Sequence, residues 1–166
     1  SNILNCYTTF KQIQLREYHY IDPIKKNNVK TVGYIAQELE TINDSLVSKT
    51  TQIIPNEMRI IDNPQYTTIS DGQYKLNLNI TLQSNETGMC KFYLSDDGIN
   101  ENEINVLYEN GGFIFTYQYT KVFFYGREVN DFNVIKKDNI MSLMHGTVLE
   151  IDRQQQADAI KIQALE

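Results

Sequence analysis

Apolar and polar positions follow two different periods along the chain, and the change of period predicts where helices and strands lie. Near the start, apolar side chains recur at helical spacing, which predicts a short amphipathic helix within residues 2–13. Residues 15–21 and 32–35 are β-prone, and a polar turn separates them. We therefore expect these two runs to pair as a hairpin, and the helix-forming residues 36–43 to fold back on it.

The middle of the chain, residues 58–125, has the pattern of a small antiparallel β unit. Residues 75–82 alternate strictly, with leucine or isoleucine at every second position, as in a strand with one buried face. The sequence Asn110-Gly111-Gly112 lies between two later β-prone runs. It predicts a hairpin, because both central residues of such a turn tolerate positive φ. We expect about five strands in this part of the chain.

The pattern becomes helical after Asn139 and stays so to the end of the chain. An amphipathic helix explains the residues up to Ile151 equally well, but those beyond it are too polar to pack on a globular core. Apolar residues nevertheless keep recurring about every 3.5 residues, as in a coiled coil, and two polar layers would fix register at some cost in stability. We therefore prefer a coiled coil and an oligomer, with this seam: Met141, Met144, Val148, Ile151, Gln155, Asp158, Ile162 and Leu165.

Together these elements predict an α+β fold in three parts. A hairpin-and-helix core occupies residues 1–57, and an antiparallel β insertion follows over residues 58–125. Residues 126–166 return to the core and end in the long C-terminal helix. The length of the chain suits one domain, or one domain with a small extension.

The charge balance and the scattered cysteines and histidines argue against several kinds of function. The chain has 15 basic and 21 acidic side chains, a net charge of −6, which has the wrong sign for binding nucleic acid. No apolar run is long enough to span a bilayer and no signal peptide is present, so no membrane partner is expected. Cys6 and Cys90 are far apart and are expected to be free thiols. His19 and His145 have no ligands at suitable spacing, and the acidic run 96–103 matches a solvated turn, so we expect no metal and no cofactor.

Three stretches, taken in order, match the pattern of a known family. They are YHYIDP followed by VGYIAQELE, then IIPNEMR, and finally the stretch from FFYGREVNDF to the terminal QALE. In these features the chain resembles the peptidase S74 family, the C-terminal intramolecular chaperone domain of phage endosialidase tailspikes and other viral fibres. It is most similar to the versions in large DNA viruses, which have a small β insertion. The same domain occurs in myelin regulatory factor.

The resemblance implies an assembly domain. Such domains trimerise, with their C-terminal helices packed round the axis as a coiled coil, and guide a preceding fibre or β-helical region into register. The expected partners are therefore two further copies of the chain and an N-terminally attached fibre region. The expected location is the virion, or the host cytoplasm during viral assembly.

The matching motifs contain no catalytic group, and the resemblance implies that they serve packing. We expect Gly33 to let a large ring or a backbone approach closely, with the C-terminal helices as its source. We expect Gln37 and Glu38 to cap the helix that they begin or to contact a neighbouring chain. The full set of motif residues is Gly33, Tyr34, Ile35, Ala36, Gln37, Glu38, Tyr125, Gly126, Glu128, Val129 and Asp131.

The family also cuts itself off, by a serine–lysine dyad in which the amine removes the hydroxyl proton and the serine attacks a backbone carbonyl. The family's Ser-Asp-x-Arg-x-Lys motif is missing here, because Asn2 follows Ser1, Cys6 stands in the lysine's place and Lys11 lies too far along. We therefore expect trimerisation without self-cleavage.

Three alternatives to a released chaperone stay open. The first is a permanent trimerisation module whose β insertion binds a surface partner. The second is an active autoprotease in which Ser1, or a residue upstream of it, is the nucleophile. The third is a domain of a cellular membrane-tethered transcription factor, against which the virus-like insertion argues.

Overall fold

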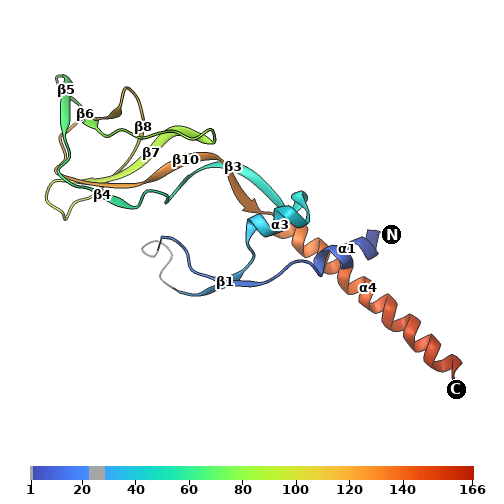
Figure 1. Ribbon diagram of the computed structural model, residues 1–166. Coiled ribbons are helices and arrows are strands. Elements are labelled where there is room, and N and C mark those ends of the chain that lie inside the picture. Colours follow the sequence, from blue (N-terminus) through green and yellow to red (C-terminus); the bar gives the residue numbers. More distant parts are fainter. Residues whose placement is uncertain (1, 23–28) are drawn as a thin grey trace. The chain divides into compact units, whose positions relative to one another are not determined.

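The computed structural model describes residues 2–22 and 29–166, and for residues 2–4 it describes the backbone alone (Figure 1). The described chain divides into two compact units of equal length. We call Ser1–Lys49 together with Asn133–Glu166 the helix unit, and Thr50–Phe132 the β unit. The unit boundaries after Lys49 and Phe132 lie eight and seven residues from the predicted boundaries after residues 57 and 125. The reason is that the chain passes between the units within two long strands.

The helix unit contains these elements: α1 (Asn2–Phe10), β1 (Arg16–Tyr18), β2 (Thr31–Gly33), α3 (Ala36–Ile42), the 3-10 turn η1 (Asp44–Leu46) and α4 (Lys137–Ala164). The strands β3 (Val47–Ile54) and β10 (Lys121–Ile135) each contribute residues to both units. The remaining strands lie in the β unit: β4 (Arg59–Ile61), β5 (Tyr66–Ser70), β6 (Gln73–Asn77), β7 (Glu86–Ser95), β8 (Asn102–Leu107) and β9 (Gly112–Phe115). The predicted α+β class and the long C-terminal helix are confirmed.

The predicted hairpin of the helix unit is present. Strands β1 and β2 pair antiparallel, with Glu17 opposite Val32. Helix α3 begins directly after Ile35, and both carboxylate oxygens of Glu38 accept hydrogen bonds of 3.1 Å from Arg16. Because Arg16 lies on β1, this contact ties the hairpin to the helix that follows it.

A small apolar core holds α3 against α4. Its buried members are Leu39, Leu46, Val47 and Ile140. The chain entering α4 is also fixed by polar contacts, since the Lys136 amide donates to the Leu46 carbonyl over 2.8 Å and the Asn139 side chain donates to the Ser45 carbonyl over 2.6 Å.

Helix α1 packs on α4 at Gly146, in the interior of α4. A Cβ on Gly146 would lie 2.7 Å from the Cβ of Cys6, closer than real side chains pack. Glycine lowers the stability of a helix interior, but at this position it is what allows α1 to approach α4. The Thr147 hydroxyl is also 3.4 Å from the Cys6 carbonyl oxygen, to which it donates. The helix does not break here.

The β unit consists of two antiparallel sheets that share one core. The first has the order β3-β10-β7-β8, with β4 also paired to β10, and the second has the order β5-β6-β9. Their inner faces meet in a cluster of buried side chains, of which four are phenylalanines: Leu76, Cys90, Phe92, Leu94, Phe113, Phe115, Val122 and Phe124. The ring of Phe92 stacks on Phe124 at a centroid distance of 4.5 Å and meets Phe113 edge-on at 4.8 Å.

Two expectations for this unit need correction. The alternating run 75–82 is a strand only as far as Asn77, although Leu78 and Ile80 still pack on the core. Alternation reports which side chains face the core, whereas a strand also needs a paired neighbour, and β6 pairs with β5 and β9 over residues 73–77. The chain before it also forms β5, so β5 and β6 make a hairpin that the sequence reading did not include.

The Asn110-Gly111 turn is present, but the two strands on either side of it belong to different sheets. Asn110 and Gly111 have φ values of 49° and 77°, and Glu109 and Gly112 exchange two backbone hydrogen bonds of 3.1 Å. Beyond this tight turn, β8 joins the first sheet and β9 joins the second. The predicted hairpin is therefore a corner where the chain changes sheet.

Candidate functional site

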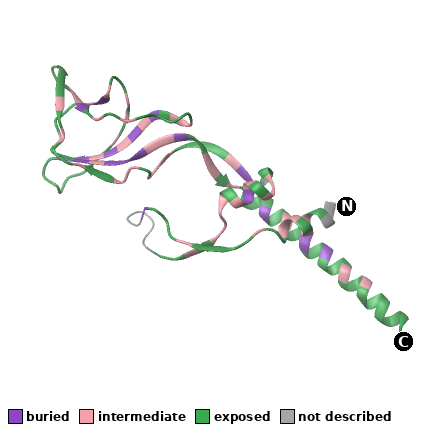
Figure 2. Cartoon of the chain, in the orientation of Figure 1, coloured by how far each residue is buried: buried purple, intermediate pink, exposed green. Residues whose placement is uncertain are grey.

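Helix α4 exposes the entire predicted seam. Its six apolar members are between 42% and 88% exposed, and Gln155 and Asp158 are exposed as well. Figure 2 shows the C-terminal part of α4 as almost wholly exposed, in contrast to the part that packs on α1 and α3. Within the described residues, the seam is thus a long apolar stripe that no element of the same chain covers.

The buried face of α4 has a different chemistry. Glu150 is only 2% exposed, and its carboxylate accepts hydrogen bonds from Arg153 at 2.7 and 2.9 Å and from Gln154 at 3.0 Å. These bonds, above all those from Arg153, lower the pKa of Glu150 to about 2, so the carboxylate stays ionised. The buried carboxylate of Glu150 therefore has its partners within α4 itself, in contrast to the exposed side chains of the seam.

The motif residues Gly33 to Glu38 form the junction between β2 and α3. A Cβ on Gly33 would lie 3.1 Å from the hydroxyl oxygen of Tyr18. The ring that approaches this glycine therefore comes from the paired strand β1, and the expectation that the C-terminal helices supply it is wrong. Tyr34 and Ala36 pack on the core of the helix unit, whereas Gln37 is exposed.

Helix α3 has no side-chain cap, since its N-cap residue is Ile35. Glu38 lies in the first turn, where a carboxylate interacts favourably with the helix dipole, and it also pairs with Arg16 over 3.1 Å. Its role within this chain is to hold the hairpin.

The motif residues Tyr125 to Asp131 all lie on β10, and the first of them meet the Pro-Asn stretch 53–59. A Cβ on Gly126 would lie 1.7 Å from the carbonyl oxygen of Ile54, so only glycine fits. The Met58 amide donates to the Tyr125 carbonyl over 3.0 Å, and the Asn56 side chain accepts from the Arg127 amide over 2.9 Å. These two motifs, about seventy residues apart in sequence, are thus packed together and joined by hydrogen bonds.

Arg127 is the centre of a half-buried ion cluster in the β unit. It pairs with Glu57 at 2.5 Å and with Glu86 at 3.0 Å, and it donates to the Thr81 carbonyl over 2.8 Å. The neighbouring Cys90 is fully buried, and this burial raises the pKa of its thiol to about 12. Arg59 also pairs with Glu57 at 2.7 Å, so two arginines balance the two glutamates of the cluster. The Cys90 thiol stays protonated, so this cysteine fits a structural role and not that of a nucleophile.

The remaining β10 motif residues also have partners within the β unit. Glu128 accepts a hydrogen bond of 2.7 Å from the Thr87 hydroxyl, and Asp131 accepts from the Asn85 side chain at 3.1 and 3.2 Å. Val129 is 4% exposed and faces Glu86 across the β7–β10 ladder. These contacts join β10 to the start of β7.

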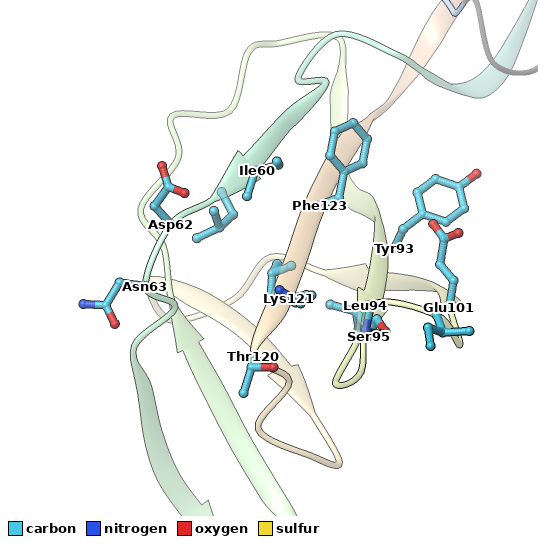
Figure 3. Close-up of a pocket in the computed structure, with 14 residues that line it drawn as sticks. Ile60, Asp62, Asn63, Tyr93, Leu94, Ser95, Glu101, Thr120, Lys121 and Phe123 are labelled. Carbon is cyan, nitrogen blue, oxygen red and sulfur yellow. Dashed lines mark hydrogen bonds between the residues drawn. The ribbon is translucent and has the colours of Figure 1, made fainter.

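An open groove of about 440 Å³ lies on the outer face of the first sheet (Figure 3). Tyr93 and Phe123 are opposite each other on β7 and β10 and line it, with their ring centroids 6.4 Å apart. Ile60 of β4 lies opposite Phe123 on the other side, and Ile99 belongs to the turn between β7 and β8. Polar lining residues are Asp62, Asn63, Ser95, Glu101, Thr120 and Lys121.

The sequence reading did not identify this groove, although a signal for it exists. Lys121, Phe123 and Tyr125 alternate with the buried Val122 and Phe124, so β10 presents large side chains on both of its faces. A strand that is apolar on both faces requires cover on both faces. The inner face is covered by the second sheet.

Within the acidic run 96–103, residues 96–101 form a turn, and Asn102 and Glu103 begin β8. Asp97 accepts hydrogen bonds from the amides of Asn100 and Ile99, each at 2.8 Å, and these bonds lower its pKa. Over residues 2–22 and 29–166, no three histidine, cysteine, aspartate or glutamate side chains are placed to hold a metal ion. In the same described residues, no helix has the length and apolarity needed to cross a bilayer.

Comparison with known proteins adds no relative, since no protein-family model, curated protein or solved structure matches the chain.

Proposed function

We propose that this chain is a homotrimeric intramolecular chaperone domain that holds three copies of an attached fibre region in register while they fold. The observation that carries the proposal is the uncovered apolar seam of α4, in which six large apolar side chains are exposed along one helix. Monomeric soluble proteins rarely leave so long an apolar stripe in water. Packing the seam against two further copies buries it in the way that a coiled coil does.

The order and content of the motifs support the same function. The stretches VGYIAQELE, IIPNEMR and FFYGREVNDF occur in the order seen in the peptidase S74 family. Two of these stretches, IIPNEMR and FFYGREVNDF, pack against each other at Gly126. Without a catalytic group among these residues, the resemblance favours the assembly role over the cleavage role. The proposed place of action is the virion, or the host cytoplasm during viral assembly.

Trimerisation suits such a task for a physical reason. Long fibre chains fold slowly, because distant contacts close large loops while unpaired strand edges are open to aggregation. Three chains joined by a coiled coil have an effective concentration of about a millimolar for one another. Their correct pairing then competes favourably with aggregation.

The first experiment measures the oligomeric state. Sedimentation equilibrium of the wild-type chain at tens of micromolar should give three times the 19.3 kDa monomer mass. Val148→Asp and Ile162→Asp place a charge in the seam and should give monomers. The matched controls are Leu149→Asp and Ile160→Asp, which alter exposed apolar residues of the same helix outside the seam and should stay trimeric. A wild-type monomer, or equal dissociation in both pairs, would contradict the proposal.

The second experiment tests the chaperone role. The gene segment that encodes the attached region is expressed with the wild-type domain or with the Val148→Asp domain, and the yield of soluble fibre trimer is compared. A chaperone domain should raise this yield, and the variant should lose the gain.

The groove on the β unit favours a second candidate, a permanent trimerisation module that stays attached and uses the β unit for contact. A longer gene product that stays as one band, while the domain is trimeric, distinguishes this module from a released chaperone. Two bands that a serine-to-alanine change reduces to one would favour release by self-cleavage.

A further inference from the structure

We propose that the groove on the outer face of the β7–β10 sheet binds a basic, apolar peptide segment of a partner protein. This inference does not depend on the oligomeric state of the chain or on the chaperone proposal, because every lining residue lies in the β unit. It gives the β unit a binding function of its own.

The first argument is the apolar surface at this groove. Ile99 is 85% exposed and Ile60 is 68% exposed, the two largest values among the large apolar residues of the β unit. Both line the same groove as the half-buried rings of Tyr93 and Phe123, Ile60 from β4 and Ile99 from the turn between β7 and β8. Aromatic rings together with exposed aliphatic side chains are typical of the central part of a protein-binding surface.

The second argument is charge. The β unit has five basic and eleven acidic side chains, a formal charge of −6, whereas the helix unit has ten of each. At the groove, the exposed carboxylates of Asp62 and Glu101 make no hydrogen bond or ion pair with any described residue, and Lys121 is the one basic side chain in the lining. This field attracts cations and repels acidic partners such as nucleic acid or anionic glycans.

The third argument is that the same face of the sheet already contains the proposed interaction once. Next to the groove, the ammonium of Lys91 lies 5.4 Å from the ring centroid of Tyr125 and pairs with Glu103 at 2.7 Å. The groove lining likewise contains two aromatic rings, those of Tyr93 and Phe123, and the exposed carboxylate of Glu101, which can receive a cation supplied from outside. A lysine or arginine of a partner can make a cation–π contact and an ion pair there, while its apolar neighbours contact Ile60 and Ile99.

The test uses four defined probes and the full chain. The first is a fluorescein-labelled octapeptide of alternating lysine and valine. The second and third replace valine by serine or lysine by glutamate, and the fourth is a neutral hexasaccharide. The lysine–valine peptide should bind at one site per chain, about tenfold or more tighter than the other peptides, since both apolar contact and charge contribute. Raising the salt concentration should weaken it.

Variants of the groove supply the controls. Ile60→Ser with Ile99→Ser should weaken binding about tenfold, whereas Ile69→Ser, at an exposed isoleucine of β5 outside the groove, should leave it unchanged. Asp62→Asn with Glu101→Gln should weaken binding several-fold and reduce its salt dependence, and Asp71→Asn should not. Absence of saturable binding, equal losses in the control variants, preference for the glutamate–valine peptide, or binding of the hexasaccharide alone would each overturn the proposal.

Discussion

The two units have equal lengths but bury their apolar residues in different ways. In the β unit, eight buried side chains form one core between two sheets, and four of them are phenylalanine rings. In the helix unit, the described core has four buried members, and most of α4 is in water. The β unit has the larger internal core and has its most exposed apolar side chains at its groove, whereas the helix unit exposes an apolar stripe along α4. The difference supports the proposal that the helix unit, through the stripe on α4, is the part that associates with further copies of the chain.

The formal charge also differs between the two units. The whole net charge of −6 belongs to the β unit, and the helix unit is formally neutral. A neutral unit with an apolar stripe can approach copies of itself without repulsion, whereas acidic units repel one another. The charge distribution thus favours the helix unit for the proposed self-association and the β unit for the proposed contact with a basic peptide.

Removing one ring from the β core should have the largest effect. Phe92→Ala deletes a fully buried ring that contacts three other phenylalanines, and we expect it to lower the free energy of unfolding of the β unit by about 4 kcal/mol. Urea unfolding followed by near-ultraviolet circular dichroism measures this loss. Phe123→Ala, on the outer face, is the matched control and should have a much smaller effect. If Phe92→Ala also dissociated the oligomer, the two units would not be independent.

Filling the close contact at Gly126 should have the next largest effect. Gly126→Ala places a Cβ on the Ile54 carbonyl oxygen, and we expect a loss of about 3 kcal/mol in the stability of the β unit. Gly72→Ala is the control, because a Cβ there meets nothing within 4 Å and only its φ of 72° opposes the change, which should cost about 1 kcal/mol. Equal losses in thermal unfolding would show that the contact between residues 53–59 and β10 is loose.

The smallest effect should be an acid dependence of the helix unit. The pKa of Glu150 is lowered from 4.5 to about 2 in the folded chain, so its stabilising contribution is present above pH 4.5 and is lost as the pH falls toward 2. Glu150→Gln and Arg153→Gln should each flatten the fall in the melting temperature of the helix unit between these pH values. Profiles parallel to that of the wild type would contradict the assignment.

Much of the fold was predictable because it depends on local pattern. The hairpin, α3 and α4 follow from β-prone and helical periods and from the polar residues between them. The motif residues were found as a set, but their contacts were not. That Tyr18 covers Gly33, or that Ile54 meets Gly126, depends on strand register and on segments far apart in the chain. The groove was missed for the same reason, because its lining comes from β4, β7, β10 and the turns beside them.

The sequence by itself determined the α+β class, the long helix with its seam, and the acidic balance, because periodicity and composition are properties of neighbouring residues. The tertiary structure alone decided three other matters. It placed two motifs against each other at Gly126, and it divided the charge between the units. It also made the Asn110-Gly111 turn the point where the chain passes from one sheet to the other. Each of these outcomes depends on which distant segments contact each other. Those contacts form when apolar faces are buried against one another, so no single stretch of the sequence predicts them.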